Sequence, residues 1–311
     1  MRVVGVTEFG GPEALRVFEV PESHTGPGEV RIAVRAAAVN PTDTLIRSGA
    51  RAEMLAKFPP PYVPGMDVAG IVDEVGDGVT TVKVGDTVMA IVLPAGSHGG
   101  YSESIVLPAG SVVREPRGVT HVEACTLPMN GLTARQALDL LALSPGQALA
   151  VTGAAGGFGG YVIQLAKADG LRVIADSSEA DEELVRNLGA DIVVRRGPDV
   201  ADRIRAEIPA GVDGLTDGSV QSGALVPAVR DGGAIATVRG WADECERGIT
   251  TRPVSVRSYA TEWAKLDTLR QQVEDGLVSL RVARTFTPQQ AGEAHRLLEA
   301  GGTRGRLVIE F

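Results

Sequence analysis

The stretch from Ala150 to Gly160 constrains this chain more than any other, because an apolar run leads directly into a turn rich in glycine. Residues 147–151 predict a buried strand, and after the turn apolar residues recur at helical spacing over 161–169. Gly170 is placed to end that helix. The segment therefore predicts a strand, a glycine turn and a helix in succession, which is half of a βαβ unit.

Such a unit favours a dinucleotide, since glycines let the backbone approach a pyrophosphate and the helix N-terminus offers N–H groups to it. Read strictly, the motif is Ala154-x-Gly156-x-x-Gly159, with alanine at the first glycine position. A second strand, 171–175, leads to Asp176, about 20 residues beyond the turn, where a ribose-binding acid is expected. A tight structural turn is the alternative reading. The turn residues predicted to contact the dinucleotide are Gly153, Ala154, Ala155, Gly156, Gly157, Phe158 and Gly159.

Composition argues against several classes of partner. The chain has 311 residues and a net charge of −9, and 4% of its residues are aromatic. An acidic chain without a basic run repels nucleic acids and anionic membrane surfaces, so neither is an expected partner. No apolar run reaches the roughly 18 residues of a membrane span, and the N-terminus shows no signal-peptide pattern. Two distant cysteines favour a reducing compartment, and a cytoplasmic protein is expected.

The order of the predicted elements divides the chain into three parts. Residues 1–118 show short strands and dense turns, which predict a mainly antiparallel β domain. Over 119–253 strands and helices alternate, which predicts a parallel, doubly wound sheet. Residues 254–311 end in a strand that is placed to return to the first domain. The expected fold class is therefore α/β, a β-rich domain with a doubly wound nucleotide-binding domain.

The periodicity also gives boundaries for individual elements. The expected strands are 2–6, 15–20, 29–38, 67–75, 87–92, 101–107, 147–151, 171–175, 191–194, 214–216, 233–238, 282–286 and 306–311. The expected helices are 42–48, 122–127, 131–141, 161–169, 179–188, 200–207, 225–229, 261–275 and 288–300, and 49–64 is expected to be a loop.

Seven short motifs occur in the order found in one enzyme superfamily. They are Val39-Asn40-Pro41-Thr42-Asp43, Pro64 to Gly70, Val84 to Val88, Gly99 to Glu103, Gly131 to Ala134, Gly153 to Gly159 and Gly301 to Val308. Together they resemble the medium-chain dehydrogenase/reductase superfamily, and within it the zinc-free NADPH:quinone oxidoreductase branch that includes zeta-crystallin. The resemblance spans nearly the whole chain. It implies a GroES-like catalytic domain made of both chain ends, an inserted Rossmann domain, an active site in the cleft and a homodimer.

Zinc-dependent relatives need about three protein ligands at a catalytic zinc, and this sequence does not offer them. Met66 and Asp67 stand where the zinc-dependent branch carries histidine and glutamate. Asp67 is expected to lie buried at a strand start and to accept backbone N–H bonds. His295, in an amphipathic helix, is expected to be solvated or to cap. No metal site is expected, and hydride transfer from a nicotinamide cofactor is the expected chemistry.

The resemblance implies that Asn40 and Asp43 line the cleft near the nicotinamide, where an amide can donate to a developing oxyanion. The alternative is structural, with Asn40 capping the helical turn 42–48 and Asp43 as its first-turn acid. Thr133 is implied to approach the nicotinamide carboxamide, with an ordinary helical threonine as the alternative. Tyr101 is a candidate proton donor or, more simply, a strand anchor.

Two sets of residues bear on the choice of nicotinamide nucleotide. Asp176 favours NAD, because a carboxylate accepts from a ribose 2′-OH and repels a 2′-phosphate. Ser177 and Ser178 can surround a phosphate, although Ser178 also fits a capping box. Arg195 and Arg196 offer two guanidinium groups to a 2′-phosphate, or are solvated arginines.

The C-terminal Arg304-Gly305-Arg306 resembles the phosphate-contacting Arg-Gly-Lys segment of the family. The resemblance favours NADPH, with NAD as the alternative. The leading hypothesis is a zinc-independent reductase that transfers a hydride from NADPH to a small quinone or α,β-unsaturated carbonyl. An enoyl-thioester reductase and a non-catalytic NADPH-binding sensor or structural protein are the alternatives.

Overall fold

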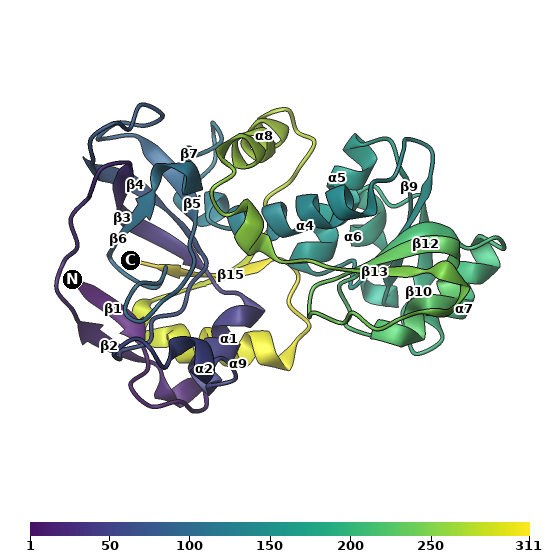
Figure 1. The fold of residues 1–311 in the computed structure, drawn as a ribbon, viewed down its shortest axis with the longest axis horizontal. Coiled ribbons are helices and arrows are strands. Elements are labelled where there is room, and N and C mark those ends of the chain that lie inside the picture. Colours follow the sequence, from purple (N-terminus) through teal and green to yellow (C-terminus); the bar gives the residue numbers. More distant parts are fainter. The chain divides into compact units, whose positions relative to one another are not determined.

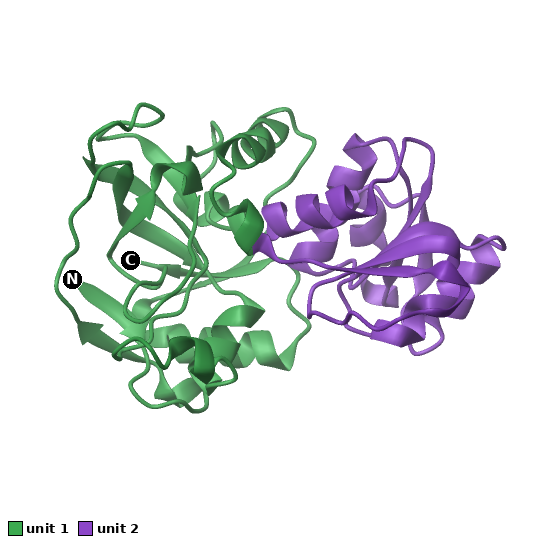
Figure 2. Cartoon of the chain, in the orientation of Figure 1, with its two compact units in different colours: residues 1–129, 257–311 green, residues 130–256 purple.

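The computed structural model describes residues 1–311 and consists of two units (Figure 2). Unit 1 contains residues 1–129 and 257–311, so both ends of the chain contribute to it. Unit 2 is the continuous segment 130–256 between them. The sequence places the divisions slightly earlier, after residues 118 and 253.

Unit 1 is built on a seven-stranded sheet in the order β14-β15-β3-β4-β5-β7, with β6 also pairing with β3 (Figure 1). Every pairing in it is antiparallel except that of β14 with β15. A separate antiparallel pair is formed by β1 and β2. The strands are β1 Arg2–Gly5, β2 Arg16–Glu19, β3 Glu29–Ala38, β4 Asp67–Val75, β5 Thr87–Ile91, β6 Ser104–Pro108, β7 Val112–Arg114, β14 Val282–Phe286 and β15 Arg306–Glu310.

The alternation of buried and partly exposed residues explains why residues 29–38 form the central strand β3 of this sheet. Val30, Ile32 and Val34 of β3 are buried, while the residues between them are partly exposed, as period 2 requires. Strand β15 pairs antiparallel with β3, opposite Ala38, so the last strand does return to the first part of the chain. The helices of unit 1 are α1 Pro41–Ser48, α2 Ala52–Leu55, α3 His121–Ala124, α8 Trp263–Glu274 and α9 Ala291–Ala300. Because α3 packs against β3 and β4, unit 1 extends beyond the predicted division.

Unit 2 contains a six-stranded parallel sheet in the order β10-β9-β8-β11-β12-β13, which confirms the doubly wound prediction. The first strand in sequence, β8, lies beside β9 on one side and β11 on the other, so the strand order reverses there. The strands are β8 Ala148–Thr152, β9 Arg172–Ser177, β10 Ile192–Arg195, β11 Val212–Asp217, β12 Val229–Thr237 and β13 Thr250–Pro253. The helices are α5 Gly157–Ala168, α6 Glu182–Asn187 and α7 Val200–Glu207, and α4 Pro128–Leu141 begins in unit 1.

Several local predictions differ from the structure. Residues 225–229 do not form an α-helix; a 3₁₀ segment, Ser222–Ala228, contains Pro227, which has no N–H to donate to a helical bond. Helix α2 lies within the predicted loop 49–64. Strand β13 was not predicted, because its sequence Thr-Thr-Arg-Pro lacks apolar alternation and only its pairing with β12 defines it. No helix combines the length and the apolar composition that a membrane crossing requires.

Candidate cofactor site and buried polar network

The glycine turn between β8 and α5 is formed by backbone packed against backbone. Gly153 has a φ of 68°, a conformation that side chains disfavour. A Cβ on Gly159 would lie 2.4 Å from the carbonyl oxygen of Gly153 and 2.7 Å from the Cα of Ala154. Gly156 is the N-cap of α5 and supplies no capping side chain. The first N–H groups of a helix have no intrahelical acceptor, so this turn fits a pyrophosphate.

Asp176, near the end of β9, is directed at the same turn. Its Oδ1 accepts the N–H of Ala154 at 3.0 Å, and the N–H of Gly153 also donates to it. The side chain is only 3% exposed, and burial raises the pKa of its carboxyl above the usual value. The ribose-binding role predicted for Asp176 stays a prediction, and the structure shows a carboxylate that holds the glycine turn.

The other predicted adenosine-side residues lie at the ends of β9 and β10. Register pairs Arg195 with Ser177, and the carbonyl of Ser177 accepts the N–H of Arg196 at 2.8 Å. The hydroxyl of Ser178 donates to the side chain of Asp181, and Ser178 is an N-cap whose side chain makes no capping hydrogen bond to a backbone N–H. Arg196 is exposed and its charge lowers the pKa of Asp176 against the effect of burial.

Arg195 is also exposed, and Glu179 lies 3.8 Å from it. A surface ion pair of this length stabilises little, so neither arginine is committed to a strong protein partner. The side chains of Ser177, Ser178, Arg195 and Arg196 thus lie at one end of the parallel sheet, beside the glycine turn. A ribose that carries a phosphate would require polar groups in this position.

In unit 1 a buried polar cluster joins Asn40, Asp67 and Arg306. Arg306 is 5% exposed, and its Nη2 donates to Asn40 Oδ1 at 2.7 Å and to Asp67 Oδ2 at 3.2 Å. Asn40 donates its Nδ2 to Asp67 Oδ2 at 2.7 Å, and the N–H of Met129 donates to Asp67 Oδ1 at 2.5 Å. The prediction that Asp67 is buried and accepts a backbone N–H is confirmed. Burial raises the pKa of Asp67, while the charge of Arg306 opposes that rise.

Asp43 connects this cluster to a second one. Its Oδ2 accepts the N–H of Asn40 at 2.8 Å and the hydroxyl of Tyr101 at 3.0 Å, and its Oδ1 accepts the N–H of Gly65 at 3.0 Å. Burial raises the pKa of Asp43 to about 7 although three donors oppose that rise. The capping interpretation of Asn40 and Asp43 matches this geometry, since Asn40 is the N-cap of α1. Both side chains are fully buried, and their predicted catalytic role stays a prediction.

His295 corrects the sequence analysis, because it is fully buried rather than solvated. Its Nε2 lies 3.2 Å from the Tyr101 hydroxyl oxygen. Since that hydroxyl donates its proton to Asp43, His295 donates through Nε2–H, and its Nδ1 is buried without a hydrogen-bond partner. Burial and the charge of Arg47 lower the pKa of His295 to about 3. The Tyr101 hydroxyl therefore joins Asp43 of α1 to His295 of α9, and the strand-anchor and proton-donor roles of Tyr101 stay predictions.

Two predicted cofactor contacts lie outside these clusters. Thr133 is buried in α4, with 8% of its surface exposed. Arg304 is half-buried and lies next to Thr303, whose carbonyl is 3.5 Å from Nη1. Arg306 is committed to Asn40 and Asp67 through Nη2, while Nη1 has no hydrogen-bond partner. The phosphate contacts predicted for both arginines stay predictions.

Sequence reasoning missed the role of Asp217, the last residue of β11. Its carboxylate is 2% exposed and accepts backbone N–H groups from the loop that follows. The available signal was its position, since an acid directly after a buried parallel strand lies at the ligand-binding edge of the sheet.

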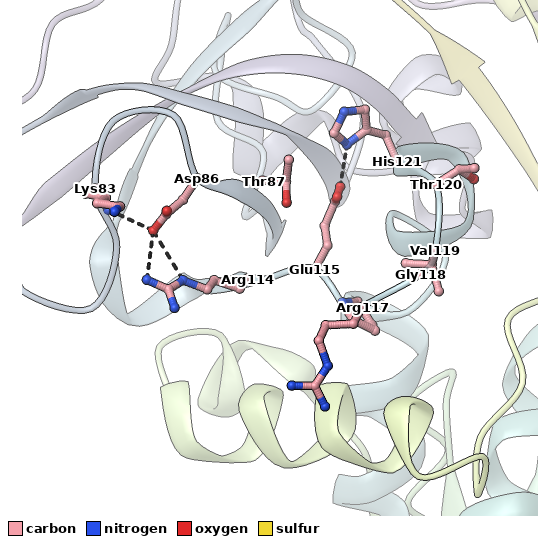
Figure 3. A pocket seen from close by; sticks show the side chains of 11 residues that line it. Lys83, Asp86, Thr87, Arg114, Glu115, Arg117, Gly118, Val119, Thr120 and His121 are labelled. Atoms are coloured by element: carbon pink, nitrogen blue, oxygen red, sulfur yellow. Dashed lines mark hydrogen bonds and ion pairs between the residues drawn. The ribbon is translucent and has the colours of Figure 1, made fainter.

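A crevice of about 730 Å³ in unit 1 is lined by several charged side chains (Figure 3). His121 Nδ1 lies 2.6 Å from Glu115, and Arg114 pairs with Asp86 at 3.1 Å. Arg117 pairs with Glu274 of α8 at 2.8 Å. Since these charges neutralise one another, we assign this crevice no function. Nowhere in the chain do three or more His, Cys, Asp or Glu side chains form a group suited to a metal ion.

Comparison with known proteins gives matches to two family models. Residues 26–117 match the alcohol dehydrogenase GroES-like domain, and residues 188–309 match the zinc-binding dehydrogenase model. The quinone oxidoreductase of Mus musculus is 30% identical, over 99% of this chain and 97% of its own length. The chain belongs to the quinone oxidoreductase branch of the medium-chain dehydrogenase/reductase superfamily. It is therefore an oxidoreductase.

Other oxidoreductases have a similar sequence identity to this chain. A mitochondrial NAD(P)H oxidoreductase of Bos taurus is 31% identical over 98% of this chain and 87% of its own length. The 2-methylene-furan-3-one reductase of Solanum lycopersicum is 29% identical over 99% and 79%. The solved quinone oxidoreductase from Coxiella burnetii superposes with a TM-score of 0.88 at 27% identity, over 100% of this chain and 99% of that one. A GroES-like domain with a Rossmann domain is thus confirmed, and a nicotinamide cofactor is supported.

Replacement of His295 by phenylalanine should make the stability of this protein less sensitive to acid. The pKa of His295 in the folded state is about 3, below the ordinary histidine value of 6.5, so the folded state resists its protonation. Its stabilising contribution is complete above pH 6.5 and is lost as pH falls toward 3, by up to about 1.4 kcal/mol per pH unit. Urea unfolding of both proteins at pH 7.5, 6 and 5 measures how steeply the free energy of unfolding falls with pH. Equal dependence of the unfolding free energy on pH in His295→Phe and wild type would contradict the assignment.

Replacement of Arg306 by methionine should destabilise the protein by about 3–5 kcal/mol, because Asp67 is left buried without a cation. The folded pKa of Asp67 then rises further, so the destabilisation grows as pH rises and shrinks in acid. The double variant Asp67→Asn/Arg306→Met should recover part of the lost free energy of unfolding, measured by urea unfolding at pH 7 in a double-mutant cycle. Exposed Arg117→Met is the control; an equal loss there would show that the buried pair is not responsible.

Proposed function

We propose that this protein transfers a hydride from NADPH to a small quinone or α,β-unsaturated carbonyl without zinc. One observation carries the proposal. The glycine turn and the start of α5 lie at the carboxyl end of β8, with Ser177 and Arg195 at the ends of the next two strands. The full-length similarity to quinone oxidoreductase from Mus musculus supports the choice of substrate class.

The residues of the turn fit the pyrophosphate of a dinucleotide. Gly159 leaves room that a Cβ would fill, and the first N–H groups of α5 carry the positive end of the helix dipole. Asp176 keeps the turn in place through Ala154 and Gly153. NADPH, when bound, supplies the hydride, while the protein supplies binding and orientation.

The proposed preference for NADPH rests on Arg195 and Arg196. Both are exposed beside Ser177, and neither has a strong ion pair, so both can turn toward a 2′-phosphate. Asp176 favours NAD only if its carboxylate accepts from a ribose hydroxyl, and its Oδ1 is already bound to the turn.

The proposed substrates follow from what unit 1 offers a carbonyl. Met66 has no metal-binding nitrogen or carboxylate, and Asp67 is committed to Arg306 and Asn40. Without a Lewis acid the substrate must already accept hydride well, as quinones and enones do. Asn40 and Asp43 enter the proposal as the residues that hold the start of α1, and Thr133, Arg304 and Arg306 as further cofactor contacts. A cytoplasmic homodimer remains part of the proposal.

Turnover by chelator-treated protein tests the function. We expect oxidation of NADPH, followed at 340 nm, in the presence of 1,4-benzoquinone or but-3-en-2-one, with little or none in the presence of a simple ketone. Added zinc should not raise the rate. Faster reduction of crotonyl-coenzyme A than of either small acceptor would favour the enoyl-thioester alternative, and binding without turnover would contradict the proposal.

The double variant Arg195→Met/Arg196→Met should raise the KM for NADPH at least about tenfold, because two charge-assisted hydrogen bonds to a phosphate are lost. The KM for NADH should stay the same. Steady-state kinetics with both nucleotides measure the two values. Arg186→Met, on α6 and paired only with Glu182, is the matched control. An equal change in the KM for NADPH and for NADH would contradict the proposal that Arg195 and Arg196 bind the 2′-phosphate.

A further inference from the structure

Asp43, Tyr101 and His295 form a chain of hydrogen bonds inside unit 1, and each of the three side chains is fully buried. The Tyr101 hydroxyl donates to Asp43 Oδ2 at 3.0 Å, and its oxygen lies 3.2 Å from His295 Nε2. The rings of Tyr101 and His295 meet edge to face, with centroids 5.9 Å apart. We call these three residues the buried triad. Each member can gain or lose a proton, so the chain of hydrogen bonds can run in either direction.

One end of the buried triad is not held by a protein group. His295 Nδ1 is buried and has no hydrogen-bond partner. In most histidines a hydrogen bond at one ring nitrogen decides which of the two nitrogens is protonated. Only Tyr101 makes such a bond to His295, so the direction of that bond alone sets the tautomer. His295 therefore loses no other hydrogen bond to the protein when it changes tautomer.

The other end of the buried triad can take up a proton at the atom that Tyr101 contacts. Asp43 Oδ2 accepts the Tyr101 hydroxyl and the N–H of Asn40, while Oδ1 accepts the N–H of Gly65. A proton on Oδ2 makes this oxygen a donor toward Tyr101, and a carboxyl group keeps acceptor capacity for both backbone N–H groups. Burial raises the pKa of Asp43 to about 7, so this protonation occurs near neutral pH.

The charges around the buried triad place an added proton on Asp43 rather than on His295. Asp67 helps to raise the pKa of Asp43, whereas burial and the charge of Arg47 lower the pKa of His295 to about 3. The imidazole is therefore neutral on both sides of the titration of Asp43. The charged groups that face the triad are Asp67 of β4, Arg306 of β15, Arg47 of α1 and its partner Glu299 of α9; the 3₁₀ turn Pro12–Ala14, which packs against α1 and α9, carries only the exposed Glu13.

We propose that the buried triad is a two-state hydrogen-bond switch that reverses its direction when it takes up one proton. In the first state Asp43 is a carboxylate, Tyr101 donates to Asp43, and His295 donates to Tyr101 through Nε2–H. When a proton is added at His295 Nδ1, the Nε2 proton passes to the Tyr101 oxygen and the Tyr101 proton passes to Asp43 Oδ2. In the second state Asp43 donates to Tyr101, Tyr101 donates to Nε2, and His295 carries its proton on Nδ1. One proton has been added, and only Asp43 has changed its charge.

The switch acts on the start of α1 and on the turn at Gly65. Asp43 accepts the N–H groups of Asn40 and Gly65, and a charged acceptor makes stronger hydrogen bonds than a neutral one. Both backbone bonds therefore weaken when the switch takes up its proton. The switch is independent of the proposed function, since it needs neither the cofactor nor the substrate.

Nitrogen-15 NMR of the full wild-type chain tests the switch, because the chemical shifts of the two ring nitrogens identify the tautomer of a histidine. We expect the proton of His295 to lie mainly on Nε2 at pH 8.5 and mainly on Nδ1 at pH 5.5, with a midpoint near pH 7. Spectra of His24→Gln, His98→Gln and His121→Gln, each of which loses one other ring, assign the signals of His295. The same tautomer at both pH values would overturn the inference, and so would an imidazolium at pH 5.5.

Tyr101→Phe removes the hydroxyl that connects the two ends of the buried triad and keeps the ring that packs against His295. We expect His295 to keep one tautomer from pH 8.5 to pH 5.5 in this variant. Tyr62→Phe is the matched control, because it removes a partly exposed tyrosine hydroxyl outside the triad, and it should show the wild-type change of tautomer. A change of tautomer that persists in Tyr101→Phe would overturn the inference. If Tyr101→Phe does not fold, the measurement on the wild-type chain decides.

Discussion

The buried contact between Arg306 and Asp67 is the interaction on which unit 1 depends most. It joins the first residue of β15 to the first residue of β4, and Asn40 at the start of α1 completes the cluster. Since both charges are out of contact with water, each is stable there only because the other is present. The C-terminal strand therefore carries a charge that the N-terminal part of the chain needs, which is a physical reason for a domain made from both chain ends.

From this cluster a continuous polar path leads through Asp43 and Tyr101 to His295 on α9. Its members are aimed at one another rather than at the surface, so they set the positions of α1 and the turn at Gly65. The opposite pKa directions of Asp43 and His295 have one cause, since burial disfavours the charged form of both an acid and a base. The network thus determines geometry at the cost of tolerance to pH.

Unit 2 depends instead on the close approach of backbone segments to one another at one end of its parallel sheet. Asp176 and Asp217 stand at the ends of the strands on either side of β8, and each carboxylate accepts N–H groups from a loop. These loops are the glycine turn and residues 218–222, where Val220 and Ser222 have positive φ. Two buried acids therefore organise the edge of the sheet where a parallel fold binds its ligands. Acids in such positions are usually interpreted as ligand contacts, and here the first partners are the protein's own backbone.

The sequence by itself determined much of the fold. Strands 29–38 and 67–75 and helix 200–207 were predicted with their observed bounds, because alternation and helical spacing are local properties of the chain. The glycine turn could be predicted equally well, because the glycines that it requires are close together in the sequence. The two-domain order followed from the change of rhythm along the chain, and the motifs carried the family.

Only the tertiary structure decided which polar side chains meet. His295 has the spacing of an amphipathic helix and charged neighbours, and its burial follows from the packing of α9 against residues nearly 200 positions earlier. The partners of Arg306 are likewise 239 and 266 residues away, and the commitment of Asp176 to Ala154 depends on the pairing of β9 with β8. Hydrogen bonds and ion pairs of this kind depend on distances between elements, which no local pattern of residues encodes.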